Sequence, residues 1–403
     1  MSSESPPILP DAYDSTRTPA RSEPASRRTG PPVLPGATLG ILGGGQLGRM
    51  FTIAARTMGY KVVVLDPDPH SPAGQLADTH LRADYADATA LARMGETCAA
   101  VTTEFENVPA ASLTALARSC RVTPAADAVA IAQDRNDEKS WLAAHGFATA
   151  PFARVEDEAE LDAALAAIGT PALLKVSRLG YDGKGQARVA TPAAAHAAFR
   201  EFGDRPCVLE GLVALERELS VVLARDDAGA CRLFPVAENR HVDGVLDASL
   251  VPARVPEALA QQARETARAV ADALGYVGVM AVEFFVADGR LLINEIAPRP
   301  HNSGHYTLDA CVTDQFEQQV RTTAGLPLGD PRLLSPAVMV NLLGDRWRQG
   351  DPHWPALLAQ PNVKLHLYGK QGARPGRKMG HFTVLDPDVD AALRLADTLR
   401  DAL

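Results

Sequence analysis

Apolar residues in the first part of the chain fall into two alternating patterns. Residues 38–42 and 62–65 are short continuous apolar runs, the length of a buried strand. Between them, residues 46–58 place apolar side chains three and four positions apart, as on one face of a helix, and Gly59 ends this pattern. The order strand, helix, strand predicts the first unit of a right-handed parallel sheet.

The same two patterns predict the elements further along the chain. We expect strands at 99–102, 173–176, 279–286, 291–296, 337–342 and 363–368, and helices at 110–118, 134–145 and 256–274. Asp288-Gly289 stands between two of these strands and indicates a hairpin. A second region starts near Asp134, and after about Leu326 the short strands and loops suggest a small third domain.

Residues 1–36 differ from everything that follows them. They are rich in Pro, Ser and Arg, mix both charges, and contain few bulky apolar side chains. Such a segment cannot bury enough surface to offset the entropy cost of ordering it. We predict a disordered extension at 1–36, with ordered structure beginning at Thr38.

Composition narrows the function classes. The chain has 403 residues, 46% of them hydrophobic, which is enough for two or three domains with real cores. A formal net charge of −9 argues against a general nucleic-acid binder, although basic residues cluster near the C-terminus. The five scattered cysteines, without C-x-x-C spacing, fit a reduced cytoplasm. We find no apolar run that would span a bilayer and no hydrophobic signal core, so we expect a soluble, cytoplasmic protein without a membrane partner.

The first glycine pattern resembles a dinucleotide-binding fingerprint. Gly43, Gly45 and Gly48 have the spacing G-x-G-x-x-G between a strand and a helix, and Asp66 ends the next strand. Taken alone, this pattern favours an NAD-dependent oxidoreductase. The alternative is a glycine turn that exists only for close packing, and the pattern by itself leaves both interpretations open.

A second glycine-rich segment carries more specific chemistry. Lys175 lies in the predicted strand 173–176, and the loop from Gly180 to Gln186 contains three glycines and Lys184. Backbone N–H groups and positive charge in such a loop can cover a triphosphate. The loop lacks Walker A spacing. The alternative interpretation is a charged surface turn.

Two glutamates interrupt otherwise apolar strands. Glu283 and Glu295 stand in the two strands that flank Asp288-Gly289. A buried carboxylate is costly unless it is paired or holds a metal, and Mg²⁺ accepts one or two carboxylates together with substrate phosphates. A plain two-residue turn would place Glu283 opposite Asn294, whereas a three-residue loop or a bulge would place it opposite Glu295, with Cβ atoms about 5 Å apart. We predict the second arrangement and a Mg²⁺ site.

The loop that follows Glu295 is also dense in polar groups. Residues 297–305 contain two stiffening prolines together with Arg299, His301 and His305. A single histidine is more often structural. Three such side chains beside a metal site are better explained by function.

Together these segments resemble the N5-carboxyaminoimidazole ribonucleotide synthetase family of ATP-grasp enzymes. The similar segments run in family order from residue 38 to the end: 43–50, 103–109, 133–135, 180–186, 294–305 and 374–381. The resemblance implies an α/β protein with an ATP-grasp fold, an N-terminal Rossmann-like (pre-ATP-grasp) domain at 37–133, and a small C-terminal β-rich domain at 326–403. The ATP-grasp domain would span 134–325, with a lid subdomain at about 147–213.

The resemblance also implies a nucleotide site. ATP would be held with Mg²⁺, or alternatively Mn²⁺, on the metal ligands Glu283 and Glu295. The remaining ATP-binding residues implied by the family are Arg135, Lys175, Gly180, Tyr181, Asp182, Gly183, Lys184, Gly185, Gln186, Glu210, Gly211, Leu212, Val213, Glu218, His241 and Asn294. Two segments depart from the usual family pattern: Leu179, where relatives carry a small residue, and the adenine segment from Gly211 onward.

The implied reaction is the carboxylation of 5-aminoimidazole ribonucleotide by ATP and bicarbonate through carboxyphosphate, in a protein expected to be a homodimer. The resemblance implies that the ribonucleotide is bound by Gln46, Leu47, Glu104, Asn302, Lys370, Arg377 and Lys378. Candidates for guiding carboxyphosphate and the proton are Tyr181, Asp182, Arg299, His301 and Lys370. A dehydrogenase, a formate-dependent glycinamide ribonucleotide transformylase and a nonenzymatic nucleotide-binding scaffold are the alternatives.

Overall fold

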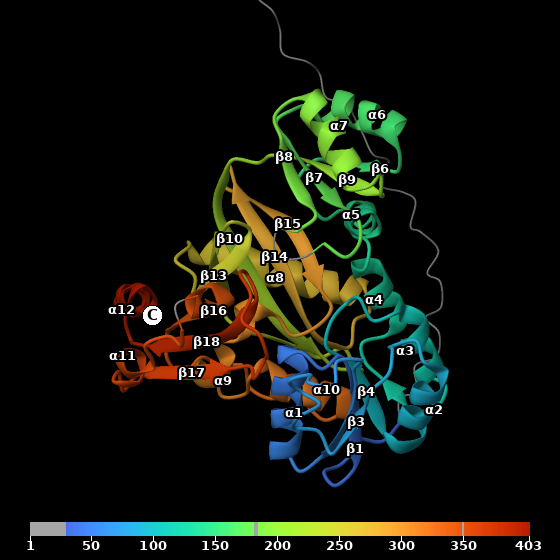
Figure 1. The fold of residues 1–403 in the computed structure, drawn as a ribbon, viewed down its shortest axis with the longest axis vertical. Helices are drawn as coiled ribbons and strands as arrows, with labels where there is room; N and C mark the ends of the chain where they lie inside the picture. The colour runs from blue at the N-terminus through green and yellow to red at the C-terminus, as the bar shows by residue number, and fades with distance from the viewer. Residues whose placement is uncertain (1–29, 181–183, 349) are drawn as a thin grey trace, which may run out of the picture.

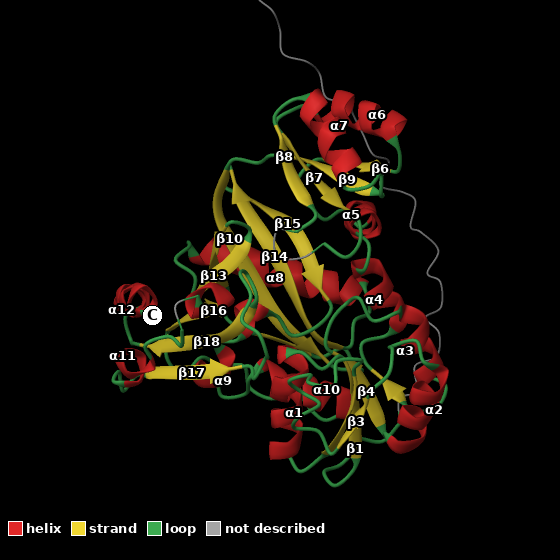
Figure 2. Ribbon diagram, in the orientation of Figure 1, coloured by secondary structure: helices red, strands yellow, loops and turns green. Residues whose placement is uncertain are grey.

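Residues 30–180, 184–348 and 350–403 are described by the computed structural model, which builds them around three sheets (Figure 1). The N-terminal sheet lies at the lower right of the view, a small sheet with two helices lies at the top, and the largest sheet runs between them and out to the left (Figure 2). Within these ranges no helix is long and apolar enough to cross a membrane.

The N-terminal sheet is parallel, in the order β3-β2-β1-β4-β5. Its strands are β1 (Thr38–Leu42), β2 (Lys61–Leu65), β3 (Thr79–Leu81), β4 (Ala100–Thr103) and β5 (Arg121–Val122). Its helices are α1 (Gln46–Thr57), α2 (Ala88–Thr97), α3 (Ala110–Leu116) and α4 (Ala126–Ala132). β1 and β2 are almost entirely buried, as continuous apolar strands of a sheet covered on both faces should be. The strand and helix predictions for this region are confirmed within a few residues.

The packed part of the chain begins before Thr38, so that part of the prediction is wrong. The amide of Val33 donates to the carbonyl of Ala324 at 2.8 Å, and the hydroxyl of Tyr60 donates to the carbonyl of Val33 at 2.7 Å. Val33 also packs against the apolar cluster under the N-terminal sheet. One apolar side chain and two hydrogen bonds therefore attach residues 33–37 to the domain. Residues 1–29 lie outside the described ranges.

Helix α5 (Arg135–Ala144) leads from the first sheet into the small one. Its N-terminus is capped by Asp134, whose carboxylate accepts from the amide of Asn136 at 2.9 Å. The small antiparallel sheet has the order β6-β9-β7-β8, with β6 (Phe152–Val155), β7 (Ala172–Val176), β8 (Gln186–Val189) and β9 (Cys207–Gly211). Two helices cover it, α6 (Glu158–Ile168) and α7 (Pro192–Glu201).

The largest sheet has the order β15-β14-β10-β12-β13-β16-β18-β17, with β11 paired to β10. Its strands are β10 (Leu215–Arg225), β11 (Cys231–Leu233), β12 (Ala237–Val242), β13 (Val245–Val251), β14 (Gly278–Ala287), β15 (Arg290–Ala297), β16 (Ala337–Leu343), β17 (Val363–Leu367) and β18 (Lys378–Leu385). The helices around it are α8 (Glu257–Ala273), α9 (Thr307–Ala310), α10 (Gln315–Ala324), α11 (Trp354–Leu358) and α12 (Val389–Ala402), with 3₁₀ turns η1 (Asn302–Gly304) and η2 (Gly344–Trp347). The predicted strands beyond residue 326 are present. They continue the central sheet through the pairing of β13 with β16.

The hairpin of β14 and β15 has the register that was predicted for Glu283 and Glu295. Asp288 and Gly289 form a two-residue turn with positive φ at both positions, +50° and +67°. A β-bulge interrupts the ladder next to Phe284 and leaves Asn294 as the extra residue. Glu283 consequently pairs with Glu295, so the predicted register is confirmed and the bulge supplies it.

Candidate active site

A cavity of about 790 Å³ opens where the three sheets meet. Side chains from α1, α5, β7, β10, β14, β15 and the C-terminal strands line it. The residues predicted from sequence that line it are Gln46, Leu47, Glu104, Arg135, Lys175, Gly180, Lys184, Gln186, Glu218, His241, Glu283, Asn294, Glu295, Arg299, His301, Asn302, Lys370, Arg377 and Lys378. Segments that are distant in the sequence therefore converge on one space.

Three oxygen-bearing side chains of the hairpin face this cavity. The bulge turns both Asn294 and Glu295 toward it, opposite Glu283. A guanidinium nitrogen of Arg135 lies 3.0 Å from the carboxylate of Glu295. Burial works to raise the pKa of Glu295, but Arg135 outweighs it and holds that pKa at about 2. Oδ1 of Asn294 is buried with no hydrogen-bond partner in the described structure, an unsatisfied acceptor beside two carboxylates.

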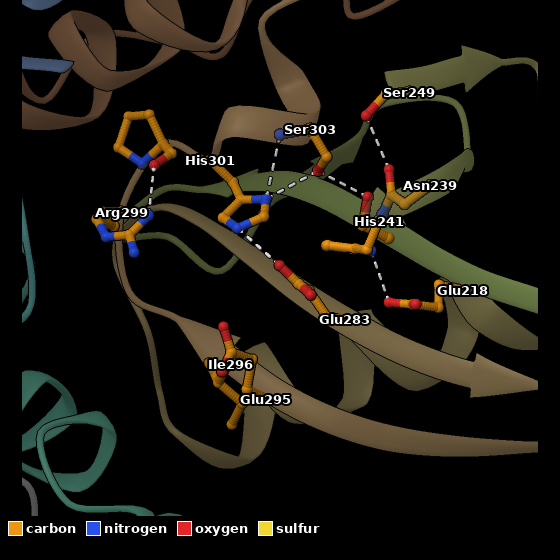
Figure 3. A network of polar contacts seen from close by, with 12 residues as sticks. Glu218, Asn239, His241, Ser249, Glu283, Glu295, Ile296, Arg299, His301 and Ser303 are labelled. Carbon is orange, nitrogen blue, oxygen red and sulfur yellow. Dashed lines mark hydrogen bonds and ion pairs between the residues drawn. The ribbon is translucent and has the colours of Figure 1, made fainter. Parts of the chain in front are cut away.

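His301 is fixed between Glu283 and Ser303 (Figure 3). Nδ1 of His301 accepts from the amide of Ser303 at 3.3 Å, and Nε2 lies 2.7 Å from Glu283. In the neutral imidazole this pattern assigns the proton to Nε2, which donates to Glu283. Ser303 is itself held by Ser220, with 2.7 Å between the two hydroxyl oxygens. The ring therefore orients the Glu283 carboxylate.

Buried basic groups stand together at the part of the cavity wall that β7 supplies. Nζ of Lys175 donates to Glu210 at 3.0 Å, and Nζ of Lys139 lies 3.6 Å from the same carboxylate oxygen. Burial lowers the pKa of Lys175. Burial works to raise the pKa of Glu210, but Lys139 and Lys175 together lower it. The charge of Lys175 is thus held in place by a fixed partner.

A second ion pair lies on the far wall. Nδ1 of His241 on β12 is 2.8 Å from the carboxylate of Glu218 on β10 (Figure 3). Burial works to lower the pKa of His241, but the neighbouring Glu218 carboxylate raises it. Glu218 and His241 therefore present one linked polar pair to the cavity.

The glycine turn before α1 holds a carboxylate of the chain itself. The amides of Gly45 and Leu47 both donate to Glu104, the latter at 3.2 Å. A Cβ on Gly45 would lie 2.2 Å from an oxygen of Glu104. Asp66 accepts from the amide of Gly44 and the hydroxyl of Tyr85, both at 2.7 Å. The turn amides that would bind a pyrophosphate in a dehydrogenase donate to Glu104 instead. The Asp66 carboxylate that would bind the ribose is already bonded to Gly44 and Tyr85, so the oxidoreductase interpretation is wrong.

The buried carboxyl of Glu104 has an unusual pKa. Burial raises it to about 7, against hydrogen bonds from the glycine turn and the charge of Lys370. Lys370 belongs to the segment that brings Arg377 and Lys378 to the same cavity. The C-terminal basic cluster of an acidic protein is thus part of the site, beside the turn that Glu104 occupies.

The cavity is also lined by three charged side chains that were not predicted from the sequence: Glu106, Glu138 and Arg374. Glu106 pairs with Arg299, and this guanidinium lowers the pKa of Glu106 against the effect of burial. Glu106 stands three positions after the end of β4, and polar residues beyond the carboxyl end of a parallel strand often face a ligand. Glu138 stands three positions after Arg135 on α5, and this helical spacing was the available signal.

Some predicted residues lie elsewhere. Glu210 sits beneath the cavity on Lys175, and Gly185, Gly211, Leu212 and Val213 are not part of the wall. Leu215, Val245, Leu246 and Phe285 supply apolar surface nearby. Tyr181, Asp182 and Gly183 lie outside the described residues, so their predicted roles stay predictions.

Elsewhere in the described ranges, Asp309, His366 and His381 form a group of metal-ligating type. The rings of His366 and His381 stack with centroids 4.6 Å apart and planes 14° apart. Because imidazole lone pairs lie in the ring plane, two stacked rings cannot converge on one ion. Asp309 pairs with His366 at 2.9 Å, and Tyr368 bonds His381 at 2.8 Å. This group is a polar stack in which only His381 is fully buried.

Family models match three consecutive parts of the chain. The ribonucleotide synthetase preATP-grasp domain matches residues 36–133, the ATP-grasp domain matches 140–316, and the phosphoribosylaminoimidazole carboxylase C-terminal domain matches 337–395. The chain is similar to N5-carboxyaminoimidazole ribonucleotide synthase of Brucella melitensis biotype 1, at 48% identity over 88% of this chain and 97% of the relative. It is similar to the synthase of Bacillus subtilis (strain 168), at 44% identity over 89% and 94%.

Solved structures give the same result. An ADP complex of an N5-carboxyaminoimidazole ribonucleotide synthetase matches with a TM-score of 0.86 and 42% identity, over 92% of this chain and 97% of that one. The synthase of Aspergillus clavatus, in complex with ADP and 5-aminoimidazole ribonucleotide, matches with a TM-score of 0.83 and 31% identity, over 91% and 98%.

Proposed function

This chain belongs to the N5-carboxyaminoimidazole ribonucleotide synthase family of ATP-grasp ligases, and on that premise we propose that it carboxylates the exocyclic amine of 5-aminoimidazole ribonucleotide. The reaction consumes ATP and bicarbonate, passes through carboxyphosphate, and releases ADP and phosphate. The product is N5-carboxyaminoimidazole ribonucleotide, and the step belongs to de novo purine (IMP) biosynthesis.

The observation that carries this proposal is the opposed pair Glu283 and Glu295. Both carboxylates face the cavity from adjacent strands, and the unpartnered Oδ1 of Asn294 lies between them in sequence and faces the same space. A set of hard oxygen donors suits Mg²⁺, with Mn²⁺ as the alternative. When bound there, the ion would draw negative charge from the phosphoryl oxygens of ATP.

The chain itself would hold the triphosphate with positive charge. Lys175, fixed by Glu210, and Arg135, fixed by Glu295, face the cavity from β7 and α5. Lys184 lines the cavity as well. These cations would stabilise charge on the transferring phosphoryl group without having to reorient. Glu218 would bind the ribose hydroxyls of ATP.

The ribonucleotide would lie toward the N-terminal sheet. Gln46, Leu47, Glu104 and Asn302 face that end of the cavity, and Lys370, Arg377 and Lys378 would bind its phosphate. The anionic phosphate and the cationic cluster match in charge. Arg374, which lines the same space, would add a fourth cation.

Carboxylation also requires an anion to be guided and a proton to be removed from nitrogen. We assign Arg299 to carboxyphosphate, because Glu106 holds its guanidinium rigidly at the cavity. Nε2 of His301 lies 2.7 Å from Glu283, so in this geometry His301 positions that carboxylate. Lys370, Tyr181 and Asp182 remain the candidates for proton transfer.

Phosphate release from ATP tests the proposal. With bicarbonate and Mg²⁺ present, release should rise strongly when 5-aminoimidazole ribonucleotide is added. Release that ignores the ribonucleotide would contradict the assigned acceptor. Replacing bicarbonate and the ribonucleotide by formate and glycinamide ribonucleotide tests the related transformylase, and turnover with that pair alone would favour the alternative.

We further propose that the protein works as a homodimer in a reducing, cytoplasmic environment. All five cysteines are buried free thiols, which fits such a compartment. Sedimentation of the purified chain would test the dimer, and a monomeric mass at assay concentration would contradict it.

A further inference from the structure

One face of α5 rests on the bulged residues of β15. Arg135, Glu138 and Lys139 stand at positions i, i+3 and i+4, which share one side of a helix. Across from them lie three consecutive residues, Asn294, Glu295 and Ile296. Each helix residue contacts one of these three.

Two of the contacts are made to the backbone of the bulge. Nζ of Lys139 donates to the carbonyl of Asn294 at 2.8 Å. The amide of Ile296 donates to Oε1 of Glu138. Lys139 and Glu138 are buried, with exposures of 1% and 2%.

The bulge needs such partners because of its place in the sheet. β15 is the terminal strand of the largest sheet, and no named strand continues the sheet beyond it in the described structure. On that outer edge the amide of Ile293 donates to the carbonyl of Ala148 at 2.8 Å, which leaves the groups after Ile293 to other partners. A bulge also removes regular ladder partners from the bulged strand. Buried backbone groups without partners are costly, and here two side chains of α5 satisfy them.

The consequence reaches the metal-binding side chains. A one-residue slip in register would reverse which face each side chain of the strand occupies. Asn294 and Glu295 must both stay on the face of Glu283 if three oxygen donors are to serve one ion. The carbonyl held by Lys139 and the amide held by Glu138 directly flank the Glu295 residue.

We propose that Glu138 and Lys139 are positioning residues, which hold the Asn294 bulge in register and thereby place Asn294 and Glu295 for the metal–nucleotide complex. This inference rests on the proposed function, since it assumes that Glu283 and Glu295 bind the ion. It adds two residues of α5 that act through the backbone of β15.

Binding of Mn²⁺ in the presence of ATP, titrated by electron paramagnetic resonance on the full chain, tests the inference. Glu138→Met removes the acceptor at nearly constant length, and Glu138→Gln keeps a carbonyl oxygen for the Ile296 amide. Substituting a residue that orients a metal ligand without touching the metal typically lowers the metal affinity about 10- to 100-fold. We expect a loss in that range for the Met variant and recovery to within about threefold for the Gln variant.

Asp137→Asn is the matched control, because Asp137 is a largely exposed neighbour on the same helix. It should bind Mn²⁺–ATP like the wild type. A folded Glu138→Met variant with wild-type binding would overturn the inference, and so would a Gln variant as weak as the Met variant. If circular dichroism shows that Glu138→Met does not fold, Lys139→Met replaces it in the same Mn²⁺ titration. Wild-type Mn²⁺–ATP binding by a folded Lys139→Met variant would then contradict the inference.

Glu295→Gln separates this inference from the proposed function. If Glu295→Gln weakens Mn²⁺–ATP binding while the α5 variants do not, the positioning role alone is wrong. If Glu295→Gln binds the ion like the wild type, the metal site itself is misassigned.

Discussion

At the scale of single residues, the site depends on carboxyl groups whose ionisation is set by different surroundings. Arg135 keeps Glu295 ionised, with a pKa of about 2, although the side chain is buried. Glu104 has a pKa of about 7, because burial outweighs the amides and Lys370. One carboxylate is thus kept charged, and the other titrates near neutrality.

The raised pKa of Glu104 predicts a pH-dependent stability. The folded-state pKa lies above the ordinary 4.5, so folding takes up a proton between those values. The contribution of Glu104 to the free energy of unfolding is fully present below pH 4.5 and is lost as the pH rises through about 7. Glu104→Gln cannot titrate, so its stability relative to wild type should improve from pH 5 to pH 8, by at most about 3 kcal/mol.

Urea unfolding of both proteins at several pH values measures this difference. Taking the difference between the two proteins cancels every other titrating group that the substitution leaves unchanged. A difference that stays constant with pH, or that moves in the opposite direction, would contradict the buried, raised state of Glu104.

At the scale of elements, two short backbone features determine which side chains face the cavity. The bulge at Asn294 brings Glu295 opposite Glu283. The glycine turn before α1 leaves room for Glu104, since side chains at Gly43 or Gly45 would overlap it. Each feature spans only a few residues, and each brings a carboxylate of one element into place against a second element.

Gly45→Ala tests the glycine turn. The φ of Gly45 is −73°, which alanine adopts freely, so the expected effect is steric. The added Cβ would lie 2.2 Å from Oε1 of Glu104 and should displace that carboxylate. We expect a loss of about 1–3 kcal/mol in the free energy of unfolding, and a higher KM for 5-aminoimidazole ribonucleotide.

Gly30→Ala is the control, because an added Cβ at Gly30 would have no atom within 4 Å. Urea unfolding and steady-state kinetics of the two variants give the comparison. Wild-type stability and KM in Gly45→Ala would show that Glu104 is not held as described.

At the scale of the whole molecule, the cavity belongs to no single sheet. α1 and its turn come from the N-terminal sheet, Lys175 from the small sheet, and Glu283 and Glu295 from the largest sheet (Figure 1). A ligand bound there contacts all three parts at once. Binding should therefore stabilise the fold as a whole.

Thermal unfolding with nucleotides provides the corresponding prediction. MgATP at a hundred times its Kd should stabilise the folded state by about 2.7 kcal/mol and raise the Tm by several degrees. NAD should leave the Tm unchanged, since Glu104 and Asp66 fill the turn that it would use. A rise with NAD and none with MgATP would contradict the proposed function.

The sequence by itself determined the local elements and most of the chemistry. Apolar periodicity predicted β1, α1, α8, β14 and β15 within one or two residues, because these segments have a clear period and end at glycine or a turn. The pair of glutamates in apolar strands predicted a cation site, and the structure confirms the register that this prediction required. The strands β10, β12 and β13 were not predicted. Their polar residues include side chains that face the cavity, and these interrupt the alternation that would mark a strand.

Only the tertiary structure decided which partner each charged group has. Sequence spacing allowed the first glycine turn to bind a pyrophosphate, but the fold brings Glu104 from 59 positions away into that place. It also brings Glu138 to Ile296 across 158 positions and Glu106 to Arg299 across 193. Local pattern fixes what a segment can form, whereas hydrogen bonds and charge pairs between distant segments depend on how the sheets pack.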